Sequence, residues 1–152
     1  MVGDVPIGGD APVSIQSMTA GYTHEVDSCV AEINRLAEAG ADIVRVAVPK
    51  REDTAVLPDI LAQSPVPIVA DVHFHYKRAL EAIEAGVHKI RLNPGNIGDV
   101  EQVNHVIDAC KAAEIPIILL ENGYTEKNTT QIYHNHLIKD FVGIEKIIEK
   151  YL

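Results

Sequence analysis

The sequence predicts an α/β protein, and more narrowly a partial barrel of parallel strands that alternate with helices. Three observations predict this fold. Short apolar runs without strict alternation are each followed by helical spacing, which is typical of parallel strands buried on both faces. Glu-Ala-Gly ends a helical pattern at 38–40 and again at 84–86, with an arginine five residues after each glycine. The offset of 46 residues spans two strand–helix units, which favours a β/α barrel over a doubly wound sheet, although both remain open.

The individual elements follow from the same patterns. A closed TIM barrel has eight strands in about 250 residues, so five visible strands predict a partial TIM barrel. Gly8-Gly9-Asp10 predicts the turn of an N-terminal hairpin. Gly40 and Gly86 are natural helix C-caps, whereas Pro58 interrupts an expected helix. The expected strands are 13–18, 43–48, 67–72, 88–92 and 115–120, and the expected helices are 24–39, 52–63, 77–85 and 99–113.

Composition limits the classes of partner. The 152 residues are 47% apolar and 23% charged, as in an ordinary globular protein. A net charge of −9 disfavours nucleic acid and anionic membranes as partners. Only two cysteines occur, Cys29 and Cys110, so neither a disulfide framework nor a CxxC metal site is expected, and a cytoplasmic location is the default. No apolar run approaches the ~20 residues of a membrane span, and the first residues lack the features of a secretion signal.

Two regions are expected. Residues 1–123 form the partial barrel and carry the substrate site. Residues 124–152 are polar as far as about residue 136 and then amphipathic over 141–152, which predicts a helical tail of uncertain origin with only a weak strand candidate at 131–136.

Two arginines lie inside apolar strands, where an unpaired guanidinium is costly. Arg45 and Arg91 occupy equivalent places in the duplicated unit. Each could form an internal salt bridge, with Asp42, Asp71 or a helix carboxylate as partner. Their recurrence at equivalent strand positions instead favours two planar donors that hold phosphate oxygens at the carboxyl ends of the strands.

Further polar residues end the other strands. Asp71 and His73 share a strand face, which suggests acid–base chemistry with Asp71 orienting His73. With His75, the same pair could hold a divalent metal, or all three could be ordinary polar residues at a strand end. The turn at 93–98 opens a helix and could present backbone N–H groups to an anion, or be an ordinary strand-to-helix turn. The substrate-binding candidates are Arg45, Arg91, Asn93, Asn96, Gln16, Ser17 and Asn122.

Five segments, read in order, resemble one family. They are VGDVPIGGDAPVSIQSMT (2–19), EAGADIVRVAVP (38–49), PVPIVADVHF (65–74), ALEAIEAGV (79–87) and IRLNPGNIG (90–98). They are similar to 4-hydroxy-3-methylbut-2-enyl diphosphate synthase, the iron–sulfur oxidoreductase of the non-mevalonate pathway of isoprenoid (terpenoid) biosynthesis. The resemblance covers about residues 2 to 117.

The resemblance implies an N-terminal TIM barrel that binds 2-C-methyl-D-erythritol 2,4-cyclodiphosphate. It also implies a separate C-terminal domain whose [4Fe-4S] cluster, ligated by three Cys and a Glu, takes electrons from ferredoxin or flavodoxin and reductively opens the ring. Members are homodimers in which one barrel faces the partner's cluster. By position, Arg45 and Arg91 match the diphosphate-binding arginines. Asp71, His73, Asn93 and Asn96 match polar residues of the substrate pocket.

Departures from the family pattern limit the expectation. The family usually has Asp where His75 stands, and an Arg where Ile118 stands. Its Asn-Ala-Gly is echoed only by Asn122-Gly123. The cluster domain is absent and two distant cysteines cannot ligate a cubane cluster, so the chain alone is not expected to perform the reduction. It would be a fragment, a truncated product or a hybrid. Two alternatives remain: a metal-dependent barrel hydrolase using Asp71, His73 and His75, and a non-catalytic partial barrel that pairs with a second copy.

Overall fold

A parallel sheet with its strands in chain order forms the centre of the fold. The computed structural model describes residues 1–8, 10–92, 96–121, 130, 132–140, 142, 144–148 and 150. In the four-stranded sheet, each strand pairs in parallel with the next along the chain. The strands are β1 (Gln16–Met18), β2 (Ile43–Ala47), β3 (Ile68–Val72) and β4 (Lys89–Leu92).

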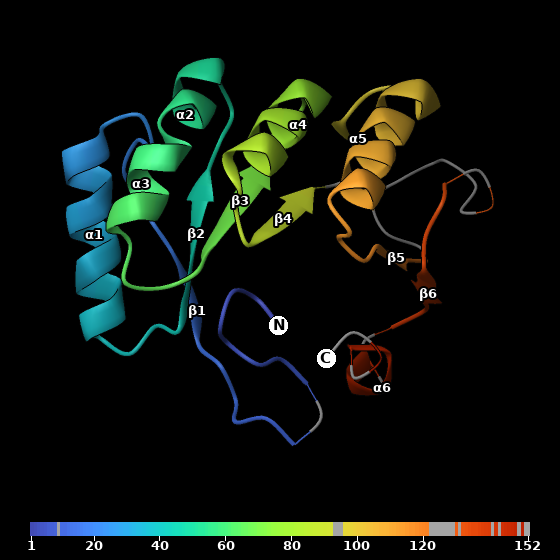
Figure 1. Ribbon diagram of the computed structural model, residues 1–152, viewed down its shortest axis with the longest axis horizontal. Coiled ribbons are helices and arrows are strands. Elements are labelled where there is room, and N and C mark those ends of the chain that lie inside the picture. Colours follow the sequence, from blue (N-terminus) through green and yellow to red (C-terminus); the bar gives the residue numbers. More distant parts are fainter. Residues whose placement is uncertain are drawn as a thin grey trace.

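Helices connect these strands as the repeating strand–helix pattern predicted. The connections from β1 to β4, and the one that follows β4, contain α1 (Val26–Glu38), α2 (Arg51–Ala55), α3 (Leu57–Gln63), α4 (Tyr76–Ala85) and α5 (Val100–Ala112). Helices α1 to α5 form an arc along one side of the strands, and the N-terminal segment lies on the other side (Figure 1). Sequential parallel strands with helices on one side are the arrangement of an incomplete β/α barrel.

The fifth strand does not join the first four within the described residues. Strand β5 (Ile118–Leu120) pairs in parallel with β6 (His136–Ile138), which lies in the region expected to be a helical tail. The predicted single sheet of five strands is therefore two sheets, of four strands and two. The expected terminal helix is represented by the short α6 (Ile144–Ile148).

The two faces of the four-stranded sheet differ in what covers them. The face toward the helices is lined by fully buried aliphatic residues, among them Val44, Val46 and Ile68. On the opposite face, which we call the inner face, Val2 packs in a small cluster with Ile43 and Val69. The N-terminal segment thus covers the end of the inner face where the strands begin, and leaves the carboxyl ends for polar side chains.

The N-terminal hairpin is smaller than predicted and lies elsewhere. An antiparallel bridge joins Val2 to Val5 across a turn at Gly3. A turn also exists at the predicted position, because the Ala11 N–H donates to the Gly8 carbonyl at 3.1 Å, while Gly9 lies outside the described residues. No described strand pairs across that second turn. Gly3 has a positive φ of 58° and approaches Pro67, so a side chain there would clash with the start of β3.

Pro58 divides the helix predicted over 52–63. Because proline lacks an N–H and its ring clashes with the carbonyl four residues earlier, a proline in the interior kinks or breaks a helix. The chain instead ends α2 at Ala55 and restarts at Leu57, with Pro58 in the first turn of α3. The first strand is also shorter than expected: the register begins at Gln16, and Val13 and Ile15 before it are exposed, although the Ile15 carbonyl still accepts from the Ile43 N–H at 3.2 Å. In the described part of the chain, no helix is both long and apolar enough to cross a bilayer.

Truncating a side chain between β3 and the helices should destabilise the whole sheet. Ile68 is 0% exposed and lies in the middle of the four strands. We expect Ile68→Ala to lower the free energy of unfolding by about 2–5 kcal/mol, because it removes buried methylene groups and leaves a cavity. Urea unfolding followed by circular dichroism measures this. Val13→Ala, at a residue 93% exposed, is the control and should change stability by less than about 0.5 kcal/mol. Equal effects of the two substitutions would contradict the packing described.

Candidate functional site

The strand register places charged side chains together on the inner face. Asp71 of β3 aligns with Arg91 of β4, and Ala47 of β2 aligns with Asp71 from the other side. Arg45 lies two residues before Ala47, so its side chain is on the same face. The two arginines predicted from the sequence repeat therefore face the same region, at the carboxyl-terminal half of the strands.

Both arginines contact a single carboxylate. Asp71 is 2% exposed, and its Oδ1 accepts a hydrogen bond from Arg91 Nη1 at 3.1 Å. Its Oδ2 lies 3.5 Å from Arg45 Nε. From the sequence, each arginine could form an internal salt bridge or bind an anion. The structure contains the salt bridge, with Asp71 as the partner of both arginines. Each guanidinium carries five N–H donors, so both retain donors for a further acceptor.

His73 joins the same cluster at its open side. Its Nε2 lies 3.4 Å from Arg91 Nη1 and 3.8 Å from Asp71 Oδ1. Because a guanidinium can only donate, a hydrogen bond between Arg91 and His73 requires Nε2 to accept and Nδ1 to carry the proton. The predicted pair of Asp71 and His73 is thus brought together, with Arg91 between them as a shared contact.

The first strand contributes a residue that the sequence did not single out. Met18 is the register partner of Arg45, and its Sδ accepts from Arg45 Nε at 3.3 Å. Of the two predicted residues, Gln16 shares this face one row nearer the strand starts. Ser17 is aligned with Val44 and belongs to the opposite face, toward the helices. The alternation of a strand separates Ser17 from the arginines.

A second overlooked residue is Lys89. It lies two residues before Arg91 on β4 and is aligned with Val69, so it also belongs to the inner face. Lys89 is exposed to solvent at the start of β4. Burial, and then the nearby Arg45 guanidinium, lower the pKa of the Lys89 ammonium.

The remaining predicted residues are placed less completely. Asn96 is exposed in a short turn ahead of α5. Asn93 and Asn122 lie outside the described residues. His75 is the N-cap residue of α4, away from the Asp71 contacts. Among the residues that the structure describes, no three His, Cys, Asp or Glu side chains gather as the ligands of a metal ion would. The metal-hydrolase alternative thus gains no support from this part of the chain.

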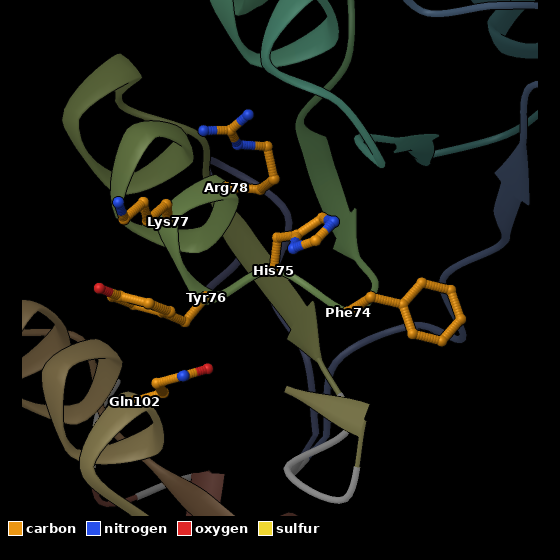
Figure 2. Close-up of a pocket in the computed structure, with 6 residues that line it drawn as sticks. All are labelled: Phe74, His75, Tyr76, Lys77, Arg78 and Gln102. Carbon is orange, nitrogen blue, oxygen red and sulfur yellow. The ribbon is translucent and has the colours of Figure 1, made fainter. Parts of the chain in front are cut away.

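A separate hollow lies beside α4. It has a volume of about 380 Å³ and is lined by Phe74, His75, Tyr76, Lys77, Arg78 and Gln102. Figure 2 shows these side chains at the start of α4, with Gln102 contributed by α5. Phe74 has a positive φ of 66° and is 64% exposed, which marks a strained turn between β3 and α4. None of the predicted substrate-binding residues lines this hollow, so it is distinct from the cationic cluster.

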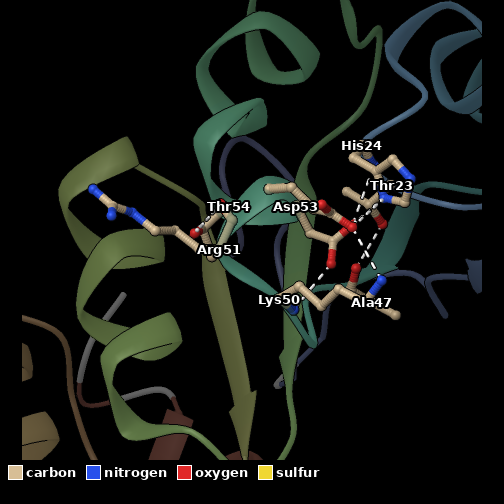
Figure 3. A network of polar contacts seen from close by, with 8 residues as sticks. Thr23, His24, Ala47, Lys50, Arg51, Asp53 and Thr54 are labelled. Atoms are coloured by element: carbon tan, nitrogen blue, oxygen red, sulfur yellow. Dashed lines mark hydrogen bonds and ion pairs between the residues drawn. The ribbon is translucent and has the colours of Figure 1, made fainter.

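A buried carboxylate fixes the loops around the strand ends. Asp53 is 3% exposed and accepts from the backbone N–H of Lys50 at 3.0 Å and from His24 Nδ1 at 2.9 Å (Figure 3). The Thr23 hydroxyl donates to the Ala47 carbonyl at 2.6 Å. These contacts join the loop after β1 to the end of β2 and the start of α2. The sequence did not predict these contacts. Its one indication was the spacing of Lys50 and Asp53, which is that of a capping box without the usual Ser or Thr at the N-cap.

The two cysteines lie in the core and are not poised as ligands. Cys29 is 1% exposed on α1, and Cys110 is 8% exposed on α5. Burial, with smaller contributions from Glu32 and Asp53, raises the pKa of Cys29 to about 11, and burial raises the pKa of Cys110. Iron–sulfur ligands are thiolates, so two separate protonated thiols do not fit a cluster.

The parallel strand order and the layer of helices define this chain as part of a β/α-barrel domain. A family model described as the GcpE TIM-barrel domain matches residues 1–150, and the chain belongs to this family. The match includes the region beyond residue 123, in which β6 pairs with β5.

Curated relatives agree with the family. A protein of Macrococcus caseolyticus named 4-hydroxy-3-methylbut-2-en-1-yl diphosphate synthase (flavodoxin) is 53% identical over 133 residues, covering 87% of this chain and 36% of the relative. A protein of the same name from Rhodospirillum rubrum is 59% identical over 110 residues, covering 72% and 29%. The chain therefore spans about a third of the length of these relatives.

Solved structures agree on the fold alone. A mandelate oxidase mutant with a C4a-OH-FMN adduct superposes with a TM-score of 0.52. The superposition covers 90% of this chain and 56% of that one, at 13% sequence identity.

Removing the Asp71 charge should destabilise the fold. We expect Asp71→Asn to lower the free energy of unfolding by about 1–3 kcal/mol, because it removes the buried acceptor shared by Arg45 and Arg91. Chemical denaturation provides the measurement. Asp10→Asn, at an exposed loop position, is the matched control and should be neutral. A stability unchanged by Asp71→Asn would show that the two contacts contribute nothing to the fold.

Burial of Cys29 predicts a specific dependence on pH. Its pKa of about 11 lies above the ordinary value of 9.0, so its contribution to stability is fully present below pH 9 and is lost as the pH rises toward 11. A Cys29→Ala variant should lack this part of the alkaline decline in urea-unfolding measurements. Both thiols should also resist a disulfide reagent until the chain unfolds. Rapid labelling of either thiol in the folded chain would contradict the burial described.

Proposed function

We propose that this chain is the substrate-holding barrel part of a 4-hydroxy-3-methylbut-2-en-1-yl diphosphate synthase. In this proposal it binds 2-C-methyl-D-erythritol 2,4-cyclodiphosphate for reductive ring opening in the non-mevalonate pathway of isoprenoid biosynthesis. Membership of the GcpE family and relatives carrying that name support the assignment. The single observation that carries the binding step is the convergence of Arg45 and Arg91 on Asp71 at the carboxyl end of the strands.

The role of each side chain follows from its contacts. Asp71 holds the two guanidinium groups on one face, so that little conformational entropy remains to be lost when an anion binds. Planar N–H groups match phosphate oxygens in pairs, which makes arginine a better fit than lysine for this task. His73 stands beside Arg91 and can donate or accept a proton at the ligand. Gln16 extends the polar lining in this proposal, Asn93 and Asn96 are assigned to it by the family resemblance, and Asn122 is assigned to it by its place at the end of the fifth strand.

The cluster of the family is not assigned to this chain. The described residues offer no group of ligands, and the buried thiols of Cys29 and Cys110 do not fit iron. We therefore assign the [4Fe-4S] cluster, and the contact with flavodoxin or ferredoxin, to other parts of the enzyme. The proposed enzyme is a cytoplasmic homodimer, and the 152-residue chain should bind the cyclodiphosphate without reducing it.

Titration with the cyclodiphosphate tests the binding step. Arg45→Ala and Arg91→Ala should each weaken binding by about tenfold or more, because a charge-assisted hydrogen bond contributes roughly 1.5–3 kcal/mol. Isothermal titration calorimetry of the full chain gives the affinities.

Arg51→Ala is the matched control. Arg51 is exposed at the start of α2, and its removal changes the net charge by the same amount. We expect wild-type affinity for this variant. Equal affinities in the wild type and in both inner-face variants would remove the site assignment.

A further inference from the structure

Lys89 lies on the inner face beside Arg45 and Arg91, and the proposed function assigns it no role. On β4 it lies one inner-face row below Arg91, roughly 7 Å away along the strand. Across the sheet it shares a row with Arg45, since both are aligned with Val69 of the intervening strand. Two strand spacings separate their backbones, or roughly 10 Å, which two long side chains can bridge. The three cations therefore form a triangle on one face.

The charges on this face do not balance. On the inner face of β1 to β4, the side chains of the described strands are Gln16, Met18, Ile43, Arg45, Ala47, Val69, Asp71, Lys89 and Arg91. Asp71 is the one carboxylate among them, against three cations. The chain as a whole has a net charge of −9, so an excess of positive charge here is a local concentration and not a general property of the surface.

Lys89 cannot be explained as a partner of that carboxylate. The Asp71 oxygens already face Arg91 and Arg45, one on each side. In the described part of the chain, the ion pairs include none for Lys89. Its identified charged neighbour is Arg45, which repels it. An ammonium held near a guanidinium, without a counter-charge, costs free energy that an anionic ligand would recover.

We propose that Lys89 is a third cation of the anion site and that it binds the second phosphate group of a diphosphate ligand. This inference rests on the proposed function and adds a determinant of specificity to it. Arg91 and Arg45 present planar forks that hold one phosphate group beside Asp71 and His73. Lys89 supplies a compact charge in the row of Arg45, one row nearer the strand starts than Arg91, within reach of a second group on the same ligand. The site then distinguishes a diphosphate from a single phosphate.

The experiment compares two inorganic probes on the full chain. Pyrophosphate and orthophosphate are titrated by calorimetry into the wild type and into Lys89→Met, Lys89→Arg, Arg91→Ala and Lys111→Met. Lys111 is the matched control, because it carries the same charge on α5 and its exposed ion pair with Asp108 contributes little. Circular dichroism verifies folding, and Lys89→Arg serves as a second variant that keeps the charge.

We expect Lys89→Met to weaken pyrophosphate binding by about tenfold and orthophosphate binding by less than about threefold, since a charged hydrogen bond is lost only from the diphosphate. Lys89→Arg should restore most of the affinity for pyrophosphate, and Lys111→Met should bind both probes as the wild type does.

The contradicting outcomes separate the two proposals. Wild-type affinity of Lys89→Met for pyrophosphate, with weakened binding by Arg91→Ala, would overturn the role of Lys89 and leave the anion site intact. Equal loss of both probes in Lys89→Met would overturn the assignment to a second phosphate group. Unchanged binding by Arg91→Ala would overturn the proposed site itself, and absence of pyrophosphate binding by the folded wild type would overturn both proposals.

Discussion

The buried carboxylate of Asp71 is the constraint on which the site depends. A carboxylate that is 2% exposed in a sheet needs partners, and the two nearest are guanidinium groups from the strands on either side. This arrangement orients Arg45 and Arg91 before any ligand arrives. The same contact serves the fold, because it gives a carboxylate partner to two guanidinium groups that would otherwise lie unpaired on an apolar sheet. Under the proposed function, stability and anion binding therefore use one set of atoms, and a substitution at Asp71 is expected to affect both.

The rest of the fold makes this face available. Aliphatic residues on the helix side of the strands provide the core, and the N-terminal segment covers the beginning of the inner face through Val2. Asp53 then joins the loops at the other end, through His24 and Lys50. What remains open is the carboxyl-terminal half of the inner face. Ligand sites of β/α barrels are found at this end of the strands, and here it carries Arg91 and Asp71, with Arg45 and Lys89 one row nearer the strand starts.

The sequence predicted the repeating part of the fold and the pair of arginines, because both depend on periodicity. Apolar runs and glycine caps recur with the strand–helix unit, and the duplication placed Arg45 and Arg91 on equivalent strands. The sequence could not predict that β5 pairs with β6, because strand pairing depends on contacts between segments that are distant in the chain. It also could not place Lys89 on the same face as the arginines, or assign Gln16 and Ser17 to opposite faces, because both depend on strand register. The sequence showed Pro58 inside a helical pattern, but it did not show whether the proline would kink one helix or divide it. The structure divides the helix at Val56.

Nitrogen-15 NMR of the arginine side chains, recorded during titration with the cyclodiphosphate, tests whether Arg45 and Arg91 belong to one anion site. In a single site the Nε–H signals of Arg45 and Arg91 shift together and saturate at the same ligand concentration, while that of Arg51 stays in place. Shifts confined to other arginines, or saturation of Arg45 and Arg91 at different concentrations, would contradict a single anion site organised by Asp71.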